Sequence, residues 1–382
     1  MKIGIVCYPT FGGSGVVATE LGKALADHGH QVHFITYSQP ARLDFFSENL
    51  FYHEVTVSKY PLFDYPPYEL ALSSKLVDVM MYEKLDILHV HYAIPHASAA
   101  YMAKQILATH GIYMPVITTL HGTDITLVGK DATYKPVVTF SINQSDGVTA
   151  VSEQLRHETC TYFKINKDIK VIPNFVDLKR FSFKPKDHFK KAIAPNGEKI
   201  LVHTSNFRKV KRIPDVIRVF HKVLQSIPAK LLLIGDGPER SPAEALCREL
   251  NIIDQVRFLG KQEAVEEILS VADLFLMPSE TESFGLSALE AMACRLPTIT
   301  TNAGGIPEIV LEGVTGFMSP VGDVEAMAAN AIFILQDEDR LKSFKDNALN
   351  RAHDFDISLI VPIYEAYYEE VIEKSKAQQI PI

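Results

Sequence analysis

The sequence predicts two doubly wound α/β domains, each with a parallel, Rossmann-like sheet covered by helices on both faces. Strand-like runs alternate with helical runs along all 382 residues. The strand-like runs are almost continuously apolar, which is typical of strands buried on both faces of a parallel sheet. The alternation also restarts near residue 199, and a chain of this length exceeds what one compact core holds.

Each half of the chain supplies its own set of strands. In the first half, strand-like runs occupy residues 2–8, 31–37, 85–92, 114–122 and 146–152, with helical runs at 16–29, 97–111 and 153–164. After the restart, strand-like runs occupy residues 198–206, 229–237, 255–260, 273–279 and 296–302. Helical segments separate these runs, so each half predicts a complete sheet.

The join between the domains falls in residues 171–181, where Pro173 and Asn174 interrupt regular structure. The last segment, residues 358–377, is typical of a helix with Pro362 near its start. We therefore expect one domain over residues 1–170 and a second over 171–362. A terminal helix at about 363–382 is expected to pack back onto the first domain.

Composition excludes several classes of partner. The net charge is −8 with no long run of one sign, whereas nucleic acid and anionic membrane surfaces both need a basic footprint. The four cysteines are far apart and have no metal-ligand spacing, which indicates a reduced, cytoplasmic protein. No apolar run approaches the ~18 residues that span a bilayer, so no stable membrane anchor is expected.

Open α/β sheets bind ligands beyond the carboxyl ends of their strands, so we expect the site in a cleft between the two domains. The loop at residues 9–17, PTFGGSGVV, follows the first strand and opens a helix. Its glycines, Gly12, Gly13 and Gly15, allow a tight turn that presents free N–H groups to an anion. The loop matches neither GxGxxG nor a P-loop, and a plain tight turn is the alternative.

A second polar strand end is TTLHGTDIT, residues 118–126. His121 follows the strand, and a neutral imidazole there can hydrogen-bond a sugar hydroxyl, although a lone histidine is more often structural. Thr119 and Asp124 belong to the polar cluster around it. The stretch HVHYAIPHA, residues 89–97, is a comparable strand end with three histidines. No cysteine or carboxylate joins them, so no metal site is expected.

Basic residues concentrate after the first strand of the second half, in SNFRKVKR, residues 205–212. Arg208 and Lys211 belong to this cluster. A diphosphate is a fitting ligand, because guanidinium binds phosphate oxygens in bidentate fashion and lysine adds a point charge. A solvated basic surface is the alternative.

Two glutamates flank a turn in TESFGLSALEAMA, residues 281–293. Glu282 precedes a helix whose first N–H groups belong to residues 284–286, and Glu290 lies within that helix. Carboxylates accept hydrogen bonds from vicinal hydroxyls, which sugars and riboses carry. For Glu290 taken alone, an ordinary surface position on the helix is the alternative.

Taken together, these stretches resemble the retaining glycosyltransferases of family 4, which have the GT-B fold. The resemblance covers almost the whole chain and is densest over residues 256–293 and 296–310. It implies a first domain that binds the acceptor and a second that binds a UDP-sugar. It also implies that Glu282 lies by the transferred sugar, Glu290 by the ribose and Lys211 by the diphosphate.

The chain departs from the family pattern at two positions. Ser283 replaces the usual glycine of E-G-F-G, and Asn206 stands where an arginine is common. Arg208, two residues further on, would supply that charge. The loop at residues 260–265 is the expected uracil site. The donor residues implied are Gly13, Asn206, Arg208, Lys211, Lys261, Val265, Glu282, Phe284, Gly285, Leu286 and Glu290.

The first half resembles the members of this family that join N-acetylglucosamine to L-malate, the first step of bacillithiol synthesis. The stretches that carry this resemblance are residues 7–15, 63–73, 88–97 and 118–129. It implies UDP-N-acetylglucosamine as donor, L-malate as acceptor and retention of the α anomer, with no cofactor or metal. The acceptor pocket would be lined by Ser14, Tyr92, Thr119 and His121.

Retention without an obvious nucleophile suggests attack from the face that UDP leaves, with catalysis by His121, Arg208, Lys211 and Glu282. Three alternatives stay open. The acceptor could instead be an inositol phosphate, a lipid-linked sugar or a sugar phosphate. The chain could be a UDP-sugar 2-epimerase, which shares the fold, or a non-catalytic sugar-nucleotide-binding protein. The sequence also leaves assembly into a homo-oligomer open.

Overall fold

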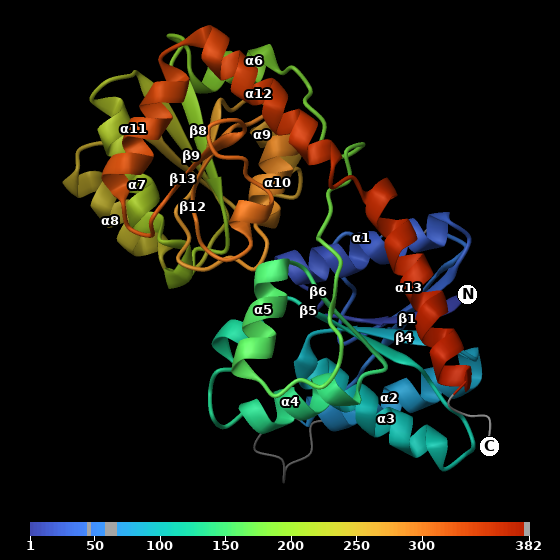
Figure 1. The fold of residues 1–382 in the computed structure, drawn as a ribbon. Coiled ribbons are helices and arrows are strands. Elements are labelled where there is room, and N and C mark those ends of the chain that lie inside the picture. Colours follow the sequence, from blue (N-terminus) through green and yellow to red (C-terminus); the bar gives the residue numbers. More distant parts are fainter. Residues whose placement is uncertain (44–46, 58–66, 378–382) are drawn as a thin grey trace. The chain divides into compact units, whose positions relative to one another are not determined.

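The computed structural model describes residues 1–43, 47–57 and 67–377 (Figure 1). Two compact units are present: Met1–Asn174 with Ile357–Ile382, and Phe175–Asp356. Each unit is a parallel sheet with helices on both faces, so the predicted pair of doubly wound α/β sheets is confirmed. Residues 63–66 of the stretch 63–73, and residues 378–382 of the expected terminal helix, lie outside the described residues.

The first unit contains a seven-stranded parallel sheet in the order β3-β2-β1-β4-β5-β6-β7. Its strands are β1 (Lys2–Val6), β2 (Gln31–Thr36), β3 (Leu50–Glu54), β4 (Ile87–His91), β5 (Val116–Leu120), β6 (Gly147–Ala150) and β7 (Lys170–Val171). All residues of β4, β5 and β6 are buried, as their continuous apolar sequence predicts. The edge strand β3 is largely exposed.

The helices and short helical turns of the first unit are α1 (Gly13–Asp27), α2 (Tyr68–Glu83), η1 (Ala93–Ala97), α3 (Ser98–Ala108), η2 (Thr123–Leu127), α4 (Lys135–Gln144), α5 (Glu153–Tyr162) and α13 (Ile357–Ala377). In Figure 1, α1 and α13 cover one face of the sheet, and α2 and α3 cover the other. Tyr364 and Tyr368 of α13 are buried, and the Tyr368 hydroxyl lies 2.8 Å from Nδ1 of His89 on β4. This buried contact fixes the end of the chain to the first sheet.

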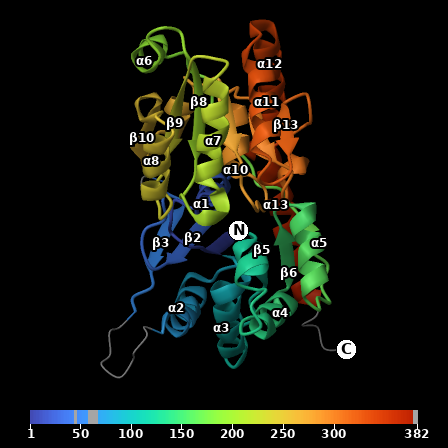
Figure 2. The ribbon, with the colours of Figure 1, turned by 90° about the vertical axis from the view of Figure 1, so that its left-hand side faces the viewer.

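The second unit contains a six-stranded parallel sheet in the order β10-β9-β8-β11-β12-β13. Its strands are β8 (Lys199–Thr204), β9 (Ala229–Ile234), β10 (Val256–Gly260), β11 (Leu274–Met277), β12 (Thr298–Thr301) and β13 (Gly316–Ser319). Figure 2 shows β10, β9 and β8 side by side. The sequence had indicated five of these strands, and β13 adds a sixth.

The helices and turns of the second unit are α6 (Asp187–Ile193), η3 (Lys209–Lys211), α7 (Ile213–Leu224), α8 (Arg240–Glu249), η4 (Ile253–Gln255), α9 (Val265–Leu269), α10 (Leu286–Ala293), η5 (Ile306–Glu308), α11 (Val324–Leu335) and α12 (Glu338–His353). Helix α7 illustrates how they pack. Ile213, Val216, Ile217 and Phe220 recur at helical spacing and are fully buried, and each such side chain contributes about 1.5–3 kcal/mol.

Candidate functional site

Strand order decides which loops meet in each unit. In the first sheet the chain runs outward from β1 through β2 to β3 and then returns to β4 beside β1. In the second sheet β8 and β11 are neighbours in the same way. Such switch points leave a crevice at the carboxyl ends of two adjacent strands. The loops after β1 and β4, and those after β8 and β11, contain most of the predicted site residues.

In the second unit the structure brings Lys211 and Glu282 into direct contact. Nζ of Lys211 donates to Oε1 of Glu282 over 2.5 Å, and both side chains are partly exposed. A backbone bond of 2.8 Å from Glu280 N–H to the Val210 carbonyl joins the same two loops. An ammonium and a carboxylate therefore lie together at the end of β8 and β11.

The turn after Glu282 depends on a glycine. Gly285 has φ +98° and immediately precedes α10, and a Cβ there would lie 2.4 Å from Cδ1 of Ile306. The N-cap residue of α10 is Gly285, which has no side chain to donate or accept a capping hydrogen bond. Phe284 is buried and meets the Phe355 ring edge-on, with 5.7 Å between centroids. The turn is therefore anchored by Phe284.

A glycine pair, Gly304 and Gly305, packs closely against the backbone of this turn. Gly305 N–H donates to the Glu282 carbonyl over 2.9 Å. Gly304 has φ +60°, and a Cβ there would lie 1.8 Å from the same carbonyl oxygen. A Cβ on Gly305 would lie 2.4 Å from the Ser283 carbonyl oxygen. Sequence reasoning gave these glycines no role, although a Gly-Gly pair shortly after a strand is a signal of close backbone approach.

The basic cluster at residues 208–212 divides on folding. Arg212 pairs with Asp215 through a 2.6 Å contact, so its charge is used to hold the start of α7. Lys211 faces Glu282. The exposed Arg208 side chain makes no ion pair with the part of the chain that the structure describes.

The other donor residues implied by the sequence lie at the same carboxyl edge of the second sheet. Asn206 is exposed in the loop after β8, and its carbonyl oxygen would lie 2.1 Å from a Cβ on Gly237 of the loop after β9. Lys261 is exposed and Val265 begins α9, both after the edge strand β10. Glu290 is partly buried in the second turn of α10. All of these residues belong to loops or helices that directly follow strands of this sheet.

In the first unit the structure brings Ser14 and Tyr92 together. Their hydroxyl groups lie 2.7 Å apart, one from the start of α1 and one from the loop after β4. Burial raises the pKa of Tyr92 to about 12, so the phenol stays protonated and can donate. Gly13, also assigned by sequence to the donor, is the exposed first residue of α1.

Asp124 holds the loops after β4 and β5 together. Its carboxylate accepts from Ala93 N–H over 2.8 Å and from Gly122 N–H over 3.1 Å. Burial raises the pKa of Asp124 to about 6, although these N–H donors oppose that shift. Asp124 is therefore a structural link between the Tyr92 and His121 loops.

His121 is held by a second histidine that sequence reasoning did not select. Nε2 of His121 lies 2.7 Å from Nδ1 of His91 on β4. Nδ1 of His96 lies 2.5 Å from the His91 carbonyl oxygen, and this contact fixes the His96 ring. Burial lowers the pKa of His121 to about 3, so its imidazole is neutral at pH 7. A neutral, oriented imidazole suits hydrogen bonding to a hydroxyl.

Thr119 lies deeper than the other predicted acceptor residues. Its side chain is completely buried, and its hydroxyl lies 2.6 Å from both His89 Nε2 and Thr149 Oγ1. The His89 and His91 rings stack with 4.4 Å between centroids. The structure thus connects Thr119 to the histidines, and the Tyr92 ring lies beside them with its centroid 5.3 Å from that of His121.

No helix among the described residues is long and apolar enough to cross a membrane.

Two family models match the chain. The model described as glycosyl transferases group 1 matches residues 184–351, and the model described as Glycosyltransferase Family 4 matches residues 11–180. The chain is 49% identical over 382 residues to N-acetyl-alpha-D-glucosaminyl L-malate synthase of Bacillus anthracis, covering 100% of both chains. It is 26% identical to D-inositol 3-phosphate glycosyltransferase of Thermobispora bispora, covering 95% of this chain and 91% of the relative.

Solved structures share the fold. Sucrose-phosphate synthase from Thermosynechococcus elongatus superposes with a TM-score of 0.80 at 22% identity, covering 98% of this chain and 100% of that one. Anabaena Alr3699/HepE, solved in complex with UDP and glucose, superposes with a TM-score of 0.81 at 20% identity, covering 97% and 99%.

Proposed function

Because the chain belongs to the family of the N-acetyl-alpha-D-glucosaminyl L-malate synthases, a family of glycosyltransferases with the GT-B fold, we propose that it makes the same product. It transfers N-acetylglucosamine from UDP-N-acetylglucosamine to the hydroxyl of L-malate and retains the α configuration. The product is the first intermediate of bacillithiol synthesis. The structural observation that carries the proposal is the Lys211–Glu282 contact beside the start of α10, whose N-cap residue is Gly285.

The donor would bind to the second unit. Glu282 would accept from the hydroxyls of the transferred sugar, and Glu290 from those of the ribose. Lys211 and Arg208 would neutralise the diphosphate, and the N–H groups of residues 284–286 would donate hydrogen bonds to its oxygens. Asn206, Lys261 and Val265 would line the remainder of the nucleotide site.

Lys211 would have two partners in turn. Without donor its charge is held by Glu282 at 2.5 Å. A bound diphosphate brings at least two negative charges, and each charge 4 Å away attracts the ammonium by about 4 kcal/mol at an effective dielectric constant of 20. This attraction exceeds that of one carboxylate, so the lysine turns toward the leaving group. Its contribution grows as the sugar–phosphate bond breaks and charge accumulates on the phosphate.

The acceptor would bind to the first unit. Malate carries two carboxylates and one hydroxyl, so its pocket needs several hydrogen-bond donors. Ser14, Tyr92 and the N–H groups at the start of α1 supply them. His121 would orient the sugar or the attacking hydroxyl, and Thr119 would position the histidines behind it through His89.

The transfer step needs no protein nucleophile or base. The malate oxygen forms a bond to the anomeric carbon on the face from which UDP departs, and the bond from that carbon to the UDP oxygen breaks. The malate hydroxyl proton passes to an oxygen of the leaving phosphate. His121 fits an orienting role, because an imidazole with a pKa of about 3 is a weak base at pH 7.

The reaction would need no metal ion, since Lys211 and Arg208 supply the positive charge that a metal would otherwise bring to the diphosphate. A reducing, cytoplasmic setting is the natural one for four cysteines that are all free thiols.

The test is UDP release from UDP-N-acetylglucosamine across a panel of acceptors, with and without L-malate and EDTA. We expect release that depends on malate and is unaffected by EDTA. The panel includes an inositol phosphate and a no-acceptor arm whose products are analysed for epimerised donor. Absence of malate-dependent release would refute the acceptor assignment.

The site assignment is tested by substitution. Lys211→Ala and Glu290→Ala are expected to reduce transfer by at least a hundredfold with the fold intact. Lys342→Ala, at an exposed position on α12, removes the same charge elsewhere and is the control. Near-native turnover in both site variants would contradict the donor site.

A further inference from the structure

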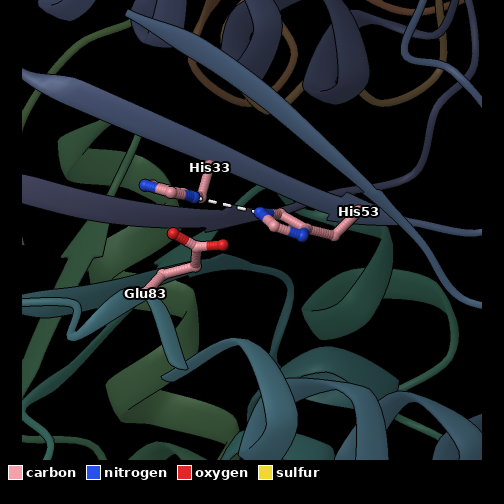
Figure 3. Close-up of side chains that lie close together, drawn as sticks. All are labelled: His33, His53 and Glu83. Carbon is pink, nitrogen blue, oxygen red and sulfur yellow. Dashed lines mark hydrogen bonds between the residues drawn. The ribbon is translucent and has the colours of Figure 1, made fainter. Parts of the chain in front are cut away.

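Three side chains with metal-binding groups converge at one edge of the first sheet (Figure 3). His33 comes from β2, His53 from the edge strand β3, and Glu83 is the last residue of α2. One donor atom from each lies within 4.8 Å of the other two. In Figure 3 the carboxylate of Glu83 points toward the two imidazole rings.

The parallel register produces this arrangement. His33 pairs with Phe51 and Ile35 pairs with His53, so the two histidines are diagonal neighbours on one face of the sheet. Their rings stack with 5.2 Å between centroids and 16° between planes. Helix α2 ends at Glu83 because Lys84 takes a left-handed conformation, and Nζ of Lys2 donates to the Glu83 carbonyl over 2.9 Å. Both strands and the helix end therefore hold the groups in place.

The spacing of the histidine nitrogens fits a shared metal ion. Nδ1 of His33 lies 3.0 Å from Nε2 of His53. Two nitrogens bound to tetrahedral zinc at 2.0–2.1 Å lie ~3.3 Å apart. A movement of a few tenths of an ångström would therefore replace the hydrogen bond between the rings with two bonds to one ion. Two imidazoles and a carboxylate form a set that suits zinc and its neighbours in the first transition row.

The ligand atoms of this cluster are available to an ion. Nδ1 of His33 faces His53, and the His33 ring is 1% exposed. The Glu83 carboxylate makes no hydrogen bond or ion pair within residues 1–43, 47–57 and 67–377. The Glu83 carboxylate is partly exposed, so it is accessible to an ion from solvent.

A comparable group at the other face of the unit behaves differently. His28 and His30 lie 2.9 and 2.8 Å from the same carboxylate oxygen of Glu365. That oxygen accepts from both rings, so the group is already satisfied without an ion. It supplies an internal control with the same residue types.

We propose that His33, His53 and Glu83 bind a divalent transition-metal ion, with zinc the best fit, which fastens the edge strand β3 to β2 and to the end of α2. The cluster shares no residue with the proposed substrate site, whose first-unit members lie on β5 or follow β1, β4 and β5. The ion is therefore structural and takes no part in transfer.

Metal binding is measured on the full chain without an affinity tag, after removal of bound metal with EDTA. Titration with ZnCl₂ in a calorimeter is expected to show one site per chain. X-ray absorption of the zinc-loaded protein is expected to show nitrogen and oxygen neighbours at about 2.0–2.1 Å and no sulfur at about 2.3 Å. A melting-temperature rise of roughly 5–10 °C is expected at about 100 times the dissociation constant.

Three variants make the test specific. His53→Ala and Glu83→Gln are expected to weaken zinc binding at least tenfold, whereas His28→Ala is expected to bind as the unsubstituted chain does. Circular dichroism of the metal-free variants verifies that they fold. Malate-dependent UDP release by His53→Ala at 25 °C is expected to match that of the unsubstituted chain.

Several outcomes would overturn the proposal. These are no stoichiometric binding, sulfur in the absorption spectrum, unchanged affinity in both cluster variants, or an equal loss in His28→Ala. Loss of transfer in a folded His53→Ala would overturn the structural role. Since binding is measured without substrates, failure here is distinct from failure of the proposed transferase activity.

Discussion

Replacement of Gly304 by alanine should reduce activity by displacing the backbone of Glu282 in the proposed donor site. The new Cβ would lie 1.8 Å from the Glu282 carbonyl oxygen, whereas real Cβ atoms stay at least 3.0 Å from such atoms. The carbonyl must therefore retreat by about 1.2 Å. That movement breaks the 2.9 Å bond from Gly305 N–H and carries Glu282 away from Lys211.

The size of the effect follows from three contributions. Alanine at a φ of +60° costs about 1–2 kcal/mol. Loss of the Gly305 hydrogen bond costs about 1 kcal/mol. A displacement of about 1 Å in a positioning group lowers the rate by about a hundredfold. We expect Gly304→Ala to lose about 2–3 kcal/mol of stability and about 10²-fold in kcat/KM for UDP-N-acetylglucosamine.

Gly313→Ala is the matched control. Gly313 has φ +69°, and a Cβ there would meet only Cε1 of Phe317, at 3.9 Å. It therefore has the same left-handed strain without the collision. The assay compares kcat/KM and melting temperature for the two variants. If Gly304→Ala stays within threefold of Gly313→Ala in kcat/KM, the argument that Glu282 depends on this glycine is wrong.

Three further predictions concern the two units. Because Lys211 and Glu282 are in contact, the effects of Lys211→Met and Glu282→Gln on kcat/KM should not add in a double-mutant cycle. The coupling energy calculated from the kcat/KM values should be about 1 kcal/mol or more, and additive losses would contradict a shared role. Tyr92→Phe should raise KM for L-malate about tenfold and leave KM for UDP-N-acetylglucosamine unchanged, which initial-rate kinetics with each substrate varied would detect. Acid should destabilise the first unit, because burial lowers the pKa of His89 and His121 to about 3. The stability that these histidines contribute is complete above pH ~6.5. As the pH falls from there toward 3, the free energy of unfolding decreases by about 1.4 kcal/mol per pH unit for each group. Asp124, whose pKa is raised to about 6, acts in the opposite direction, but burial also lowers the pKa of His91 and His96 in the same unit. Urea midpoints should therefore fall between pH 7 and pH 5, and an unchanged midpoint would contradict this account.

Sequence reasoning missed three of the four edge strands of the described sheets. These are β3, β7 and β13, whereas the fourth edge strand, β10, was predicted. β3 reads Leu-Phe-Tyr-His-Glu and is mostly exposed, so it lacks the continuous apolar run that marks a central strand. Its place is fixed by pairing with β2, which local sequence does not encode.

The side-chain contacts within the candidate site could not be predicted from the sequence either. Lys211 and Glu282 were selected separately, from a basic cluster and from a turn with two glutamates. Their contact depends on β8 and β11 being neighbours, although β9 and β10 lie between them in sequence. The roles of Gly304 and of His91 depend on the same kind of long-range neighbour. The assignment of each residue to donor or acceptor stays a prediction for the experiments above.

The sequence by itself determined the fold class and the loops that matter. Apolar strand runs alternating with helices admit only a covered parallel sheet, and all parallel strands place their carboxyl ends at one edge. Tertiary structure alone decided which loops meet: the Lys211–Glu282 pair, the His91–His121 pair, and the convergence of His33, His53 and Glu83. Local propensity acts over a few residues, whereas strand order and register bring together residues 20 to 71 positions apart.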